Sequence, residues 1–357
     1  MSRKSRKQIR RNVLILLLVF PAWMPPSIGI AGVVQTAEKT SSLSASSTFP
    51  LSQVDDRGHD IHLDGFASRI VSLSPNITEL VFSAGAGGKL VGASRYSDFP
   101  EAAKSLPDVG DSSSLDLEQI MVLKPDLVIA WRSGNGRSDI EKLEKLGLRV
   151  FAAEATTLED IPRLLRTIGE LAGTATHAES AASAYEEELR QIKRNYGDGR
   201  KISVFQLIWH QPLMTVNGKH VISDIINMCG GINIFESASS ITPVVSAENL
   251  LEADPGVIIS SVPFGSAETG VEALFRRFPH IRAVRSGHLF FVHPDILHRQ
   301  TVRILQAAKT VCAQLESARS SQEKKIMRRN DKRSMIRPGF QAVDAKTEPD
   351  FIDRKLS

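Results

Sequence analysis

The sequence lacks a hydrophobic segment long enough to cross a membrane comfortably. Its apolar run at residues 13–20 is much shorter than the roughly 20 residues that a transmembrane helix needs. A basic segment precedes this run, and small residues such as Gly29 and Ala31 follow it, which is the order of an export signal. We expect residues 1–31 to be a signal peptide, cleaved after Ala31 or Ala37, with an uncleaved anchor as the alternative.

Cysteine is scarce, because Cys229 and Cys312 are the only two in 357 residues. Neither lies near the expected cleavage site, so we expect no lipid anchor on the mature N-terminus. An even pair in an exported chain is compatible with one disulfide that stabilises the second half of the molecule. Two buried free thiols remain the alternative, since sequence does not give their distance.

The body of the chain lacks the basic excess typical of nucleic-acid binding. The net charge is +4, but residues 1–31 carry six Lys/Arg and no acid, and residues 319–357 carry eleven Lys/Arg against six Asp/Glu. Residues 32–318 therefore carry a net charge of about −7, and we expect no nucleic-acid partner. The charged stretch 319–357 has no apolar period, so we predict a flexible tail.

Catalytic signatures are missing as well. The sequence contains no Gly-x-Ser-x-Gly, His-Glu-x-x-His or Walker motif. His210, His293 and His298 lie in the second half, but only the last two are close in sequence, so we expect no metal site. We expect a protein without catalytic residues, a cofactor or enzymatic activity.

A long amphipathic helix is present near the middle of the chain. Apolar residues recur there at alternating steps of four and three: Ala178, Ala182, Tyr185, Leu189, Ile192 and Tyr196. At 1.5 Å per residue the helix would be about 30 Å long. We interpret residues 174–197 as a rigid strut between an N-terminal lobe, 54–173, and a C-terminal lobe, 198–318. A Ser/Thr-rich linker, 32–53, precedes the lobes.

The segments on either side of this helix are similar. Glu118 lies seven residues before Pro125, Glu248 lies seven residues before Pro255, and an apolar strand pattern follows each proline. We interpret this as an internal repeat at the scale of a lobe. The predicted fold class is α/β, with two Rossmann-like lobes joined by a long rigid helix. Ligands usually bind in the cleft between two such domains.

Aromatic and small polar residues follow several predicted strands. Pro75 lies between a strand and a helix, Tyr96 is in a loop, and Trp131 and Trp209 each come directly after a strand. Ligands of open α/β sheets bind at the carboxyl ends of the strands. We therefore interpret Trp131 as a ligand contact, with a cap on the core as the alternative.

Several segments carry the motifs of a known family, over roughly residues 57–316. They are residues 69–79, 96–100, 117–135, 229–235 and 295–312. They resemble the periplasmic cobalamin-binding proteins of bacterial vitamin importers. The Lys-Pro-Asp-Leu-Val and Ser-Pro-x-x-Thr-Glu motifs are shared with the wider helical-backbone class of binding proteins. The Ala-Trp-Arg-x-Gly-Asn and Cys-Gly-Gly motifs are more particular to the cobalamin branch.

This resemblance implies a periplasmic protein that captures a corrinoid between its lobes and delivers it to an ABC importer. The residues that would line the corrinoid site are Pro75, Tyr96, Trp131, Trp209, Asp295 and Arg299. It also implies a disulfide between Cys229 and Cys312. We expect a monomer that meets the membrane only through the permease, with the corrinoid as cargo and not as a cofactor.

The resemblance further implies that Glu118 and Glu248 contact arginines of the permease dimer. Their equivalent places in the repeat suit a two-fold partner, although two ordinary solvated acids would give the same sequence. Asp295 and Arg299 can likewise be a surface pair. Where the family can present further tryptophans, this chain has Ser112 and Thr242, which leaves the exact corrinoid open.

Two alternatives remain from the sequence. The first keeps the fold but binds haem or a ferric siderophore. The second is a two-lobed chelatase-like enzyme centred on His210 or His298, against which an export signal argues.

Overall fold

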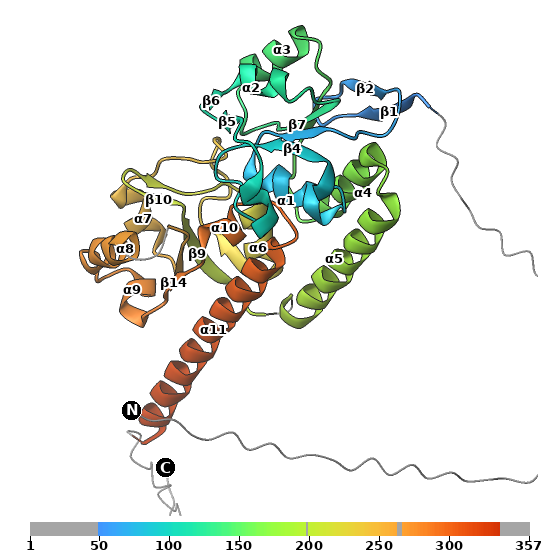
Figure 1. The fold of residues 1–357 in the computed structure, drawn as a ribbon. Coiled ribbons are helices and arrows are strands. Elements are labelled where there is room, and N and C mark those ends of the chain that lie inside the picture. The colour runs from blue at the N-terminus through green and yellow to red at the C-terminus, as the bar shows by residue number, and fades with distance from the viewer. Residues whose placement is uncertain (1–48, 198, 263–265, 336–357) are drawn as a thin grey trace, which may run out of the picture. The chain divides into compact units, whose positions relative to one another are not determined.

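The computed structural model describes residues 49–197, 199–262 and 266–335, and these form two α/β lobes (Figure 1). The predicted signal peptide and most of the predicted linker lie outside the described residues. Within them, no helix combines the length and hydrophobicity of a bilayer-spanning segment.

The first lobe is built on a parallel sheet of four strands in the order β4-β3-β7-β8. Its strands are β3 (Ile70–Ser72), β4 (Leu90–Ala93), β7 (Leu127–Trp131) and β8 (Val150–Ala153). Its helices are α1 (Pro75–Ser83), α2 (Leu117–Val122), α3 (Arg137–Lys145) and α4 (Asp160–Ala172). The strands are almost wholly buried because α1 and α4 pack on one face of the sheet, and α2 and α3 on the other.

The second lobe has a parallel sheet in the order β12-β9-β13-β14. Its strands are β9 (Ile202–Leu207), β12 (Gly231–Asn233), β13 (Val257–Ser260) and β14 (Leu289–Phe291). Its helices are α6 (Val221–Met228), α7 (Ala247–Ala253), α8 (Ser266–Arg276), α9 (Arg282–Ser286), α10 (Pro294–Leu297) and α11 (Ile304–Met335). In both lobes the first strand in sequence lies between the second and the third. This shared order confirms the predicted repeat.

Within the described residues, three short antiparallel hairpins lie outside the two sheets. They pair β1 (Leu51–Val54) with β2 (Asp60–Leu63), β5 (Gly110–Asp111) with β6 (Ser114–Leu115), and β10 (Trp209–His210) with β11 (Leu213–Met214). β1 lies partly in the stretch 32–53 that was predicted as a linker, so the predicted boundary at residue 53 was wrong. Leu51 packs on the core of the first lobe, which orders this end of the segment.

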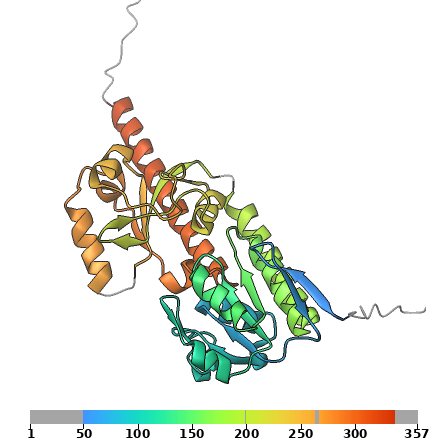
Figure 2. The same cartoon turned by 90° about the horizontal axis from the view of Figure 1, so that it is seen from above.

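The predicted strut is an unbroken helix, α5 (Ala175–Tyr196), of 22 residues. Its buried residues are Ala178, Ala182, Tyr185, Leu189 and Ile192, as the spacing predicts. The helix lies along α4 of the first lobe, as Figures 1 and 2 both show, and it also contacts α11 of the second lobe.

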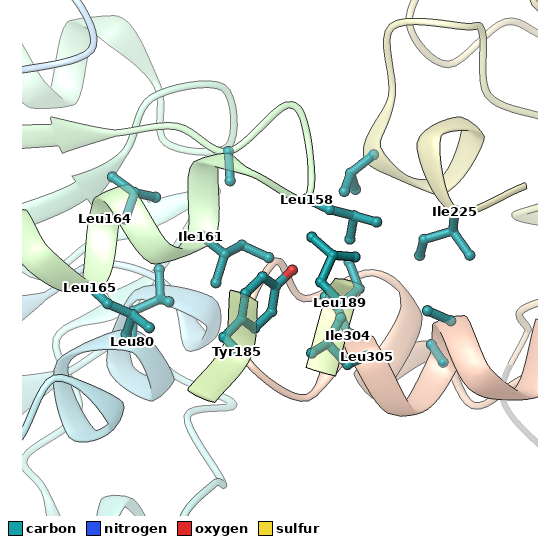
Figure 3. Packing of buried hydrophobic residues seen from close by; sticks show 14 of the residues in the cluster. Leu80, Leu158, Ile161, Leu164, Leu165, Tyr185, Leu189, Ile225, Ile304 and Leu305 are labelled. Atoms are coloured by element: carbon teal, nitrogen blue, oxygen red, sulfur yellow. The ribbon is translucent and has the colours of Figure 1, made fainter. Parts of the chain in front are cut away.

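One apolar core continues from lobe to lobe beside this helix (Figure 3). It runs from Leu80 and Leu164 in the first lobe, past Tyr185 and Leu189 of α5, to Ile304 of α11. Because protein interiors are close-packed, a large change in the angle between the lobes would open voids in this core. The two lobes therefore share one continuous core.

Helix α11 extends into the stretch that was predicted as a flexible tail. The chain from Arg319 was expected to be flexible, but α11 continues to Met335. Arg319 is 3% exposed, and its Nε donates to the carbonyl of Arg200 at 2.8 Å. The prediction failed because Lys and Arg are good helix formers even without an apolar period. Residues 336–357 lie outside the described part.

The two cysteines form a disulfide. Cys229 follows α6, Cys312 lies in α11, and their Cα atoms are 4.7 Å apart. The bridge joins two helices that cover the same face of the second sheet, and the expected pairing is confirmed.

Candidate functional site

A cavity of about 390 Å³ lies between the two lobes. The first lobe lines it with Trp131, Arg132, Ser133, Glu154, Ala155 and Thr156, and the second with Lys219, His220, Val221, Ile241, Thr242 and Gln300. Ligand sites in proteins are usually roughly 300–1,000 Å³ and often lie between domains. This cavity is therefore the candidate ligand site.

The fold brings the ends of two strands and the start of one helix to this cavity. Strand β7 ends at Trp131, strand β8 ends directly before Glu154, and His220 is the N-cap of α6. The cavity thus lies beyond the carboxyl ends of the first sheet, where open α/β sheets bind ligands.

The indole of Trp131 is held in one orientation. Its Nε1 donates to Glu154 Oε1 at 3.2 Å, and its backbone N–H donates to Asn135 Oδ1 at 2.7 Å. Asn135 is fixed in turn, because its Nδ2 donates to the carbonyl of Leu73 at 3.0 Å. Gly134 packs so closely on the ring that a Cβ there would lie 1.9 Å from Trp131 Cε3. The aromatic surface of the cavity is preorganised.

Glu154 is the carboxylate of the cavity. Its Oε1 also accepts from Ser133 Oγ at 3.1 Å, and its backbone N–H donates to Asp56 Oδ2 at 2.6 Å. Its Oε2 is buried and has no hydrogen-bond partner among the residues that the structure describes. An unsatisfied buried acceptor is unfavourable, so a donor that reached it would be stabilised there.

Two histidines of the second lobe are kept neutral near this cavity. Burial lowers the pKa of His220 to about 4, and the nearby His298 adds to the effect. Burial also lowers the pKa of His298 to about 4, and its Nε2 lies 2.6 Å from Ser261 Oγ. Because His220 Nδ1 accepts from the backbone N–H of Ile222 at 3.2 Å, the proton of the neutral ring is on Nε2.

A buried carboxylate joins the lobes at another point. Glu79 in α1 is 2% exposed and accepts hydrogen bonds from the segment between α10 and α11. Its donors are Arg299 Nη1 at 3.0 Å, Thr301 Oγ1 at 2.9 Å and Arg303 Nε at 2.9 Å. Arg303 Nη2 donates to it as well. We call Glu79, Arg299, Thr301 and Arg303 the interlobe clamp.

The clamp extends to the loop that contains Tyr96. Arg299 Nη1 lies 2.6 Å from Asp98 Oδ1, and its Nη2 donates to the carbonyl of Tyr96 at 3.4 Å. Burial opposes ionisation of Asp98, but the hydrogen bond and charge of Arg299 outweigh it and lower the pKa of Asp98. The guanidinium of Arg303 lies 4.0 Å from the centre of the Phe99 ring, a cation–π contact.

The structure brings together some of the predicted ligand residues. Trp131 lines the cavity, whereas the other five do not. Arg299 Nη2 donates to the carbonyl of Tyr96 and lies 3.4 Å from Asp295 Oδ1, so these three residues are neighbours at the clamp. Pro75 is the first residue of α1. Trp209 is 48% exposed in the β10–β11 hairpin and donates from Nε1 to the carbonyl of Gln211 at 2.8 Å.

Sequence reasoning missed several residues of the cavity and the clamp. Glu154, His220 and Gln300 line the cavity, and no motif marks them. Arg299 and Arg303 reach Glu79 from the non-helical segment between α10 and α11, so no helical spacing marks the clamp in the sequence.

Glu118 and Glu248 occupy equivalent places in the two lobes. Each lies in the first turn of its helix, α2 or α7, and each helix leads into the third strand of its sheet. Both side chains are exposed, and neither forms an ion pair within the described ranges. The backbone N–H of Glu248 and the Ser246 hydroxyl lower the pKa of Glu248.

No metal centre is evident in residues 49–335 as far as they are described. They contain no group of three or more His, Cys, Asp or Glu side chains arranged to hold an ion.

Comparisons with known proteins agree with this architecture. A model of the periplasmic binding protein family matches residues 70–296. The vitamin B12-binding protein of Vibrio campbellii is 35% identical over 256 residues, which are 72% of this chain and 92% of that protein.

Solved structures of periplasmic binding proteins have a similar fold. The periplasmic vitamin B12 binding protein of Vibrio cholerae is similar with a TM-score of 0.66 and 32% identity, over 71% of this chain and 98% of that chain. The periplasmic haem-binding protein of a Roseiflexus species has a TM-score of 0.62 at 23% identity, over 71% and 99%, and shares the fold. The family and these relatives are binding proteins and not enzymes, which excludes the chelatase-like alternative. This chain belongs to the periplasmic binding protein family.

Proposed function

We propose that this protein captures cobalamin or a related corrinoid in the interlobe cavity and delivers it to an ABC importer. The observation that carries the proposal is the cavity itself, which is bounded by both lobes and contains the fixed indole of Trp131. A large flat macrocycle can stack on such a ring. The names of the relatives in two Vibrio species support a corrinoid as the ligand.

The contacts between the two lobes support a preformed site. The continuous core beside α5 and the interlobe clamp both limit closure. Affinity would then depend on a cavity that is already shaped for its ligand, because few side chains or loops would have to be ordered on binding. The ligand is released unchanged, so it is cargo and not a cofactor.

Delivery requires a surface that the permease can recognise. Glu118 and Glu248 are exposed carboxylates at equivalent places in the two lobes. A permease dimer with two-fold symmetry would offer each of them the same basic partner. We propose that the protein works as a monomer in the periplasm and meets the membrane only through this permease.

Titration calorimetry of the purified protein with cobalamin, cobinamide, haem and a ferric hydroxamate tests the proposal. We expect one corrinoid to bind per chain, and the ferric hydroxamate not to bind. Binding of haem or the hydroxamate with no response to either corrinoid would contradict the proposed ligand.

Haem is the second candidate, because His220 lines the cavity and the backbone hydrogen bond to its ring goes to Nδ1 and not to Nε2. A histidine of this kind can ligate haem iron. A shift of the Soret band on titration that is lost in His220→Ala would favour haem. An unchanged Soret spectrum would dismiss it.

A further inference from the structure

Two cationic side chains line the interlobe cavity from opposite lobes. Arg132 directly follows β7 in the first lobe, and Lys219 lies two residues before α6 in the second. Both are exposed. Neither side chain forms an ion pair or a hydrogen bond within the part of the chain that the structure describes.

The other charged side chains of this region already form ion pairs or hydrogen bonds. Glu79, Asp98 and Asp295 surround Arg299, and Glu79 also binds Arg303. Glu154, the carboxylate of the cavity, accepts from Trp131 and Ser133 and pairs with neither cation. The lining of the cavity therefore carries two cations against the single carboxylate of Glu154, an excess of positive charge, although residues 32–318 are acidic as a whole.

Neutral hydrogen-bond donors lie beside these two cations. The Nε2–H of His220 is a hydrogen-bond donor, because Nδ1 already accepts from Ile222. Lys219 is held in place by its backbone N–H, which donates to Asn217 Oδ1 at 2.9 Å. The first turn of α6 begins here, and helix N-termini favour anions.

We propose that Arg132 and Lys219 bind an anionic group of the ligand and so select corrinoids that keep their nucleotide loop. Cobalamin carries neutral carboxamides around its ring and one phosphodiester in that loop, whereas cobinamide lacks the phosphodiester. A phosphodiester and a haem propionate share the chemistry that this pair recognises. This inference rests on the proposed function.

The test compares cobalamin and cobinamide on the variant Arg132→Gln with Lys219→Gln, by titration calorimetry at two salt concentrations. We expect cobalamin to lose affinity on the order of tenfold, because each exposed charge contact is modest. Cobinamide affinity should not change. The salt dependence of cobalamin binding should also decrease in the variant.

A matched control removes the same charge elsewhere. Lys145→Gln with Arg285→Gln changes one exposed cation in each lobe, and neither residue lines the cavity. This control should bind cobalamin as the unmodified protein does. Equal losses for both corrinoids, or no loss for cobalamin, would overturn the inference and leave the proposed function intact. Binding of haem alone would instead overturn the proposed function.

Discussion

The carboxylate of Glu79, in the first lobe, lies against the guanidinium of Arg303, in the second, although 224 residues separate them in sequence. Glu79 is 2% exposed and also accepts from Arg299 and Thr301. Breaking a buried pair of this kind leaves charges without partners in a poorly solvated place. The clamp is therefore a site where one substitution should affect the whole lobe pair.

Glu79→Ala should lower the free energy of unfolding by about 3–5 kcal/mol, because Arg299 and Arg303 lose their shared partner. Urea denaturation followed by circular dichroism measures the change. Glu101→Ala is the control, since Glu101 forms an exposed pair with Lys104 and should change stability by less than about 1 kcal/mol. A Glu79→Ala protein as stable as the parent would show that the clamp does not stabilise the fold.

Trp131→Ala should weaken corrinoid binding by at least about tenfold, because it removes a large stacking surface. Gly134→Ala should weaken binding too, since the added Cβ would displace the indole that it touches. Calorimetry gives the affinity, and tryptophan fluorescence reports the displaced ring. Gly88→Ala is the control, because a Cβ there meets nothing within 4 Å. Unchanged affinity in both variants would remove Trp131 from the site.

Stability should decrease as the pH falls from about 6.5 to 4. Burial lowers the pKa of both His220 and His298 to about 4, whereas unfolded histidines titrate near 6.5. In this window the unfolded chain binds protons that the folded protein does not, so acid favours unfolding. Each histidine should contribute a loss on the order of 3 kcal/mol.

Denaturation midpoints at several pH values measure this dependence. The double variant His220→Gln with His298→Gln should have a flatter profile between pH 6.5 and 4 than the parent. Parallel profiles would mean that these two side chains are not the cause.

Replacing Cys229 and Cys312 by serine should lower the free energy of unfolding by about 4 kcal/mol, because the bridge closes a long loop in the unfolded chain. Thermal unfolding with and without a reductant measures this. The reductant should destabilise the parent and leave the double variant unchanged. Neither cysteine lines the cavity, so ligand affinity of the folded variant should be preserved.

Glu118→Lys combined with Glu248→Lys should spare corrinoid binding but impair uptake through the permease. The two side chains lie outside the cavity, so calorimetry should give the parental affinity. Uptake of labelled corrinoid into proteoliposomes that contain the permease measures delivery. Glu141→Lys with Glu252→Lys is a charge-matched control. Normal uptake by the Glu118 and Glu248 variant would show the docking assignment to be wrong.

The sequence predicts local elements well where periodicity is strong. The five residues buried along α5 are those whose spacing indicated an amphipathic helix. The repeated Glu-to-Pro spacing predicted two lobes of like design, and both sheets have the same strand order. These features are determined by neighbours in sequence, which is why a pattern reveals them.

Contacts between distant segments were not predictable in this way. Arg299 was expected at the ligand site, but its nearest partners are Glu79 and Asp98 from the other lobe. Glu154 accepts the hydrogen bond that orients the Trp131 indole, because β8 ends beside Trp131. Long-range contacts of this kind depend on how the lobes pack, and no short motif records that.

The apolar core that continues past α5 has a consequence for thermal behaviour. If one lobe unfolded alone, apolar surface of Leu189 and Ile304 that is buried in the shared core would become exposed to water. Calorimetric heating should therefore give a single cooperative peak. A bound corrinoid should raise the temperature of that whole peak, and not of one half of the molecule.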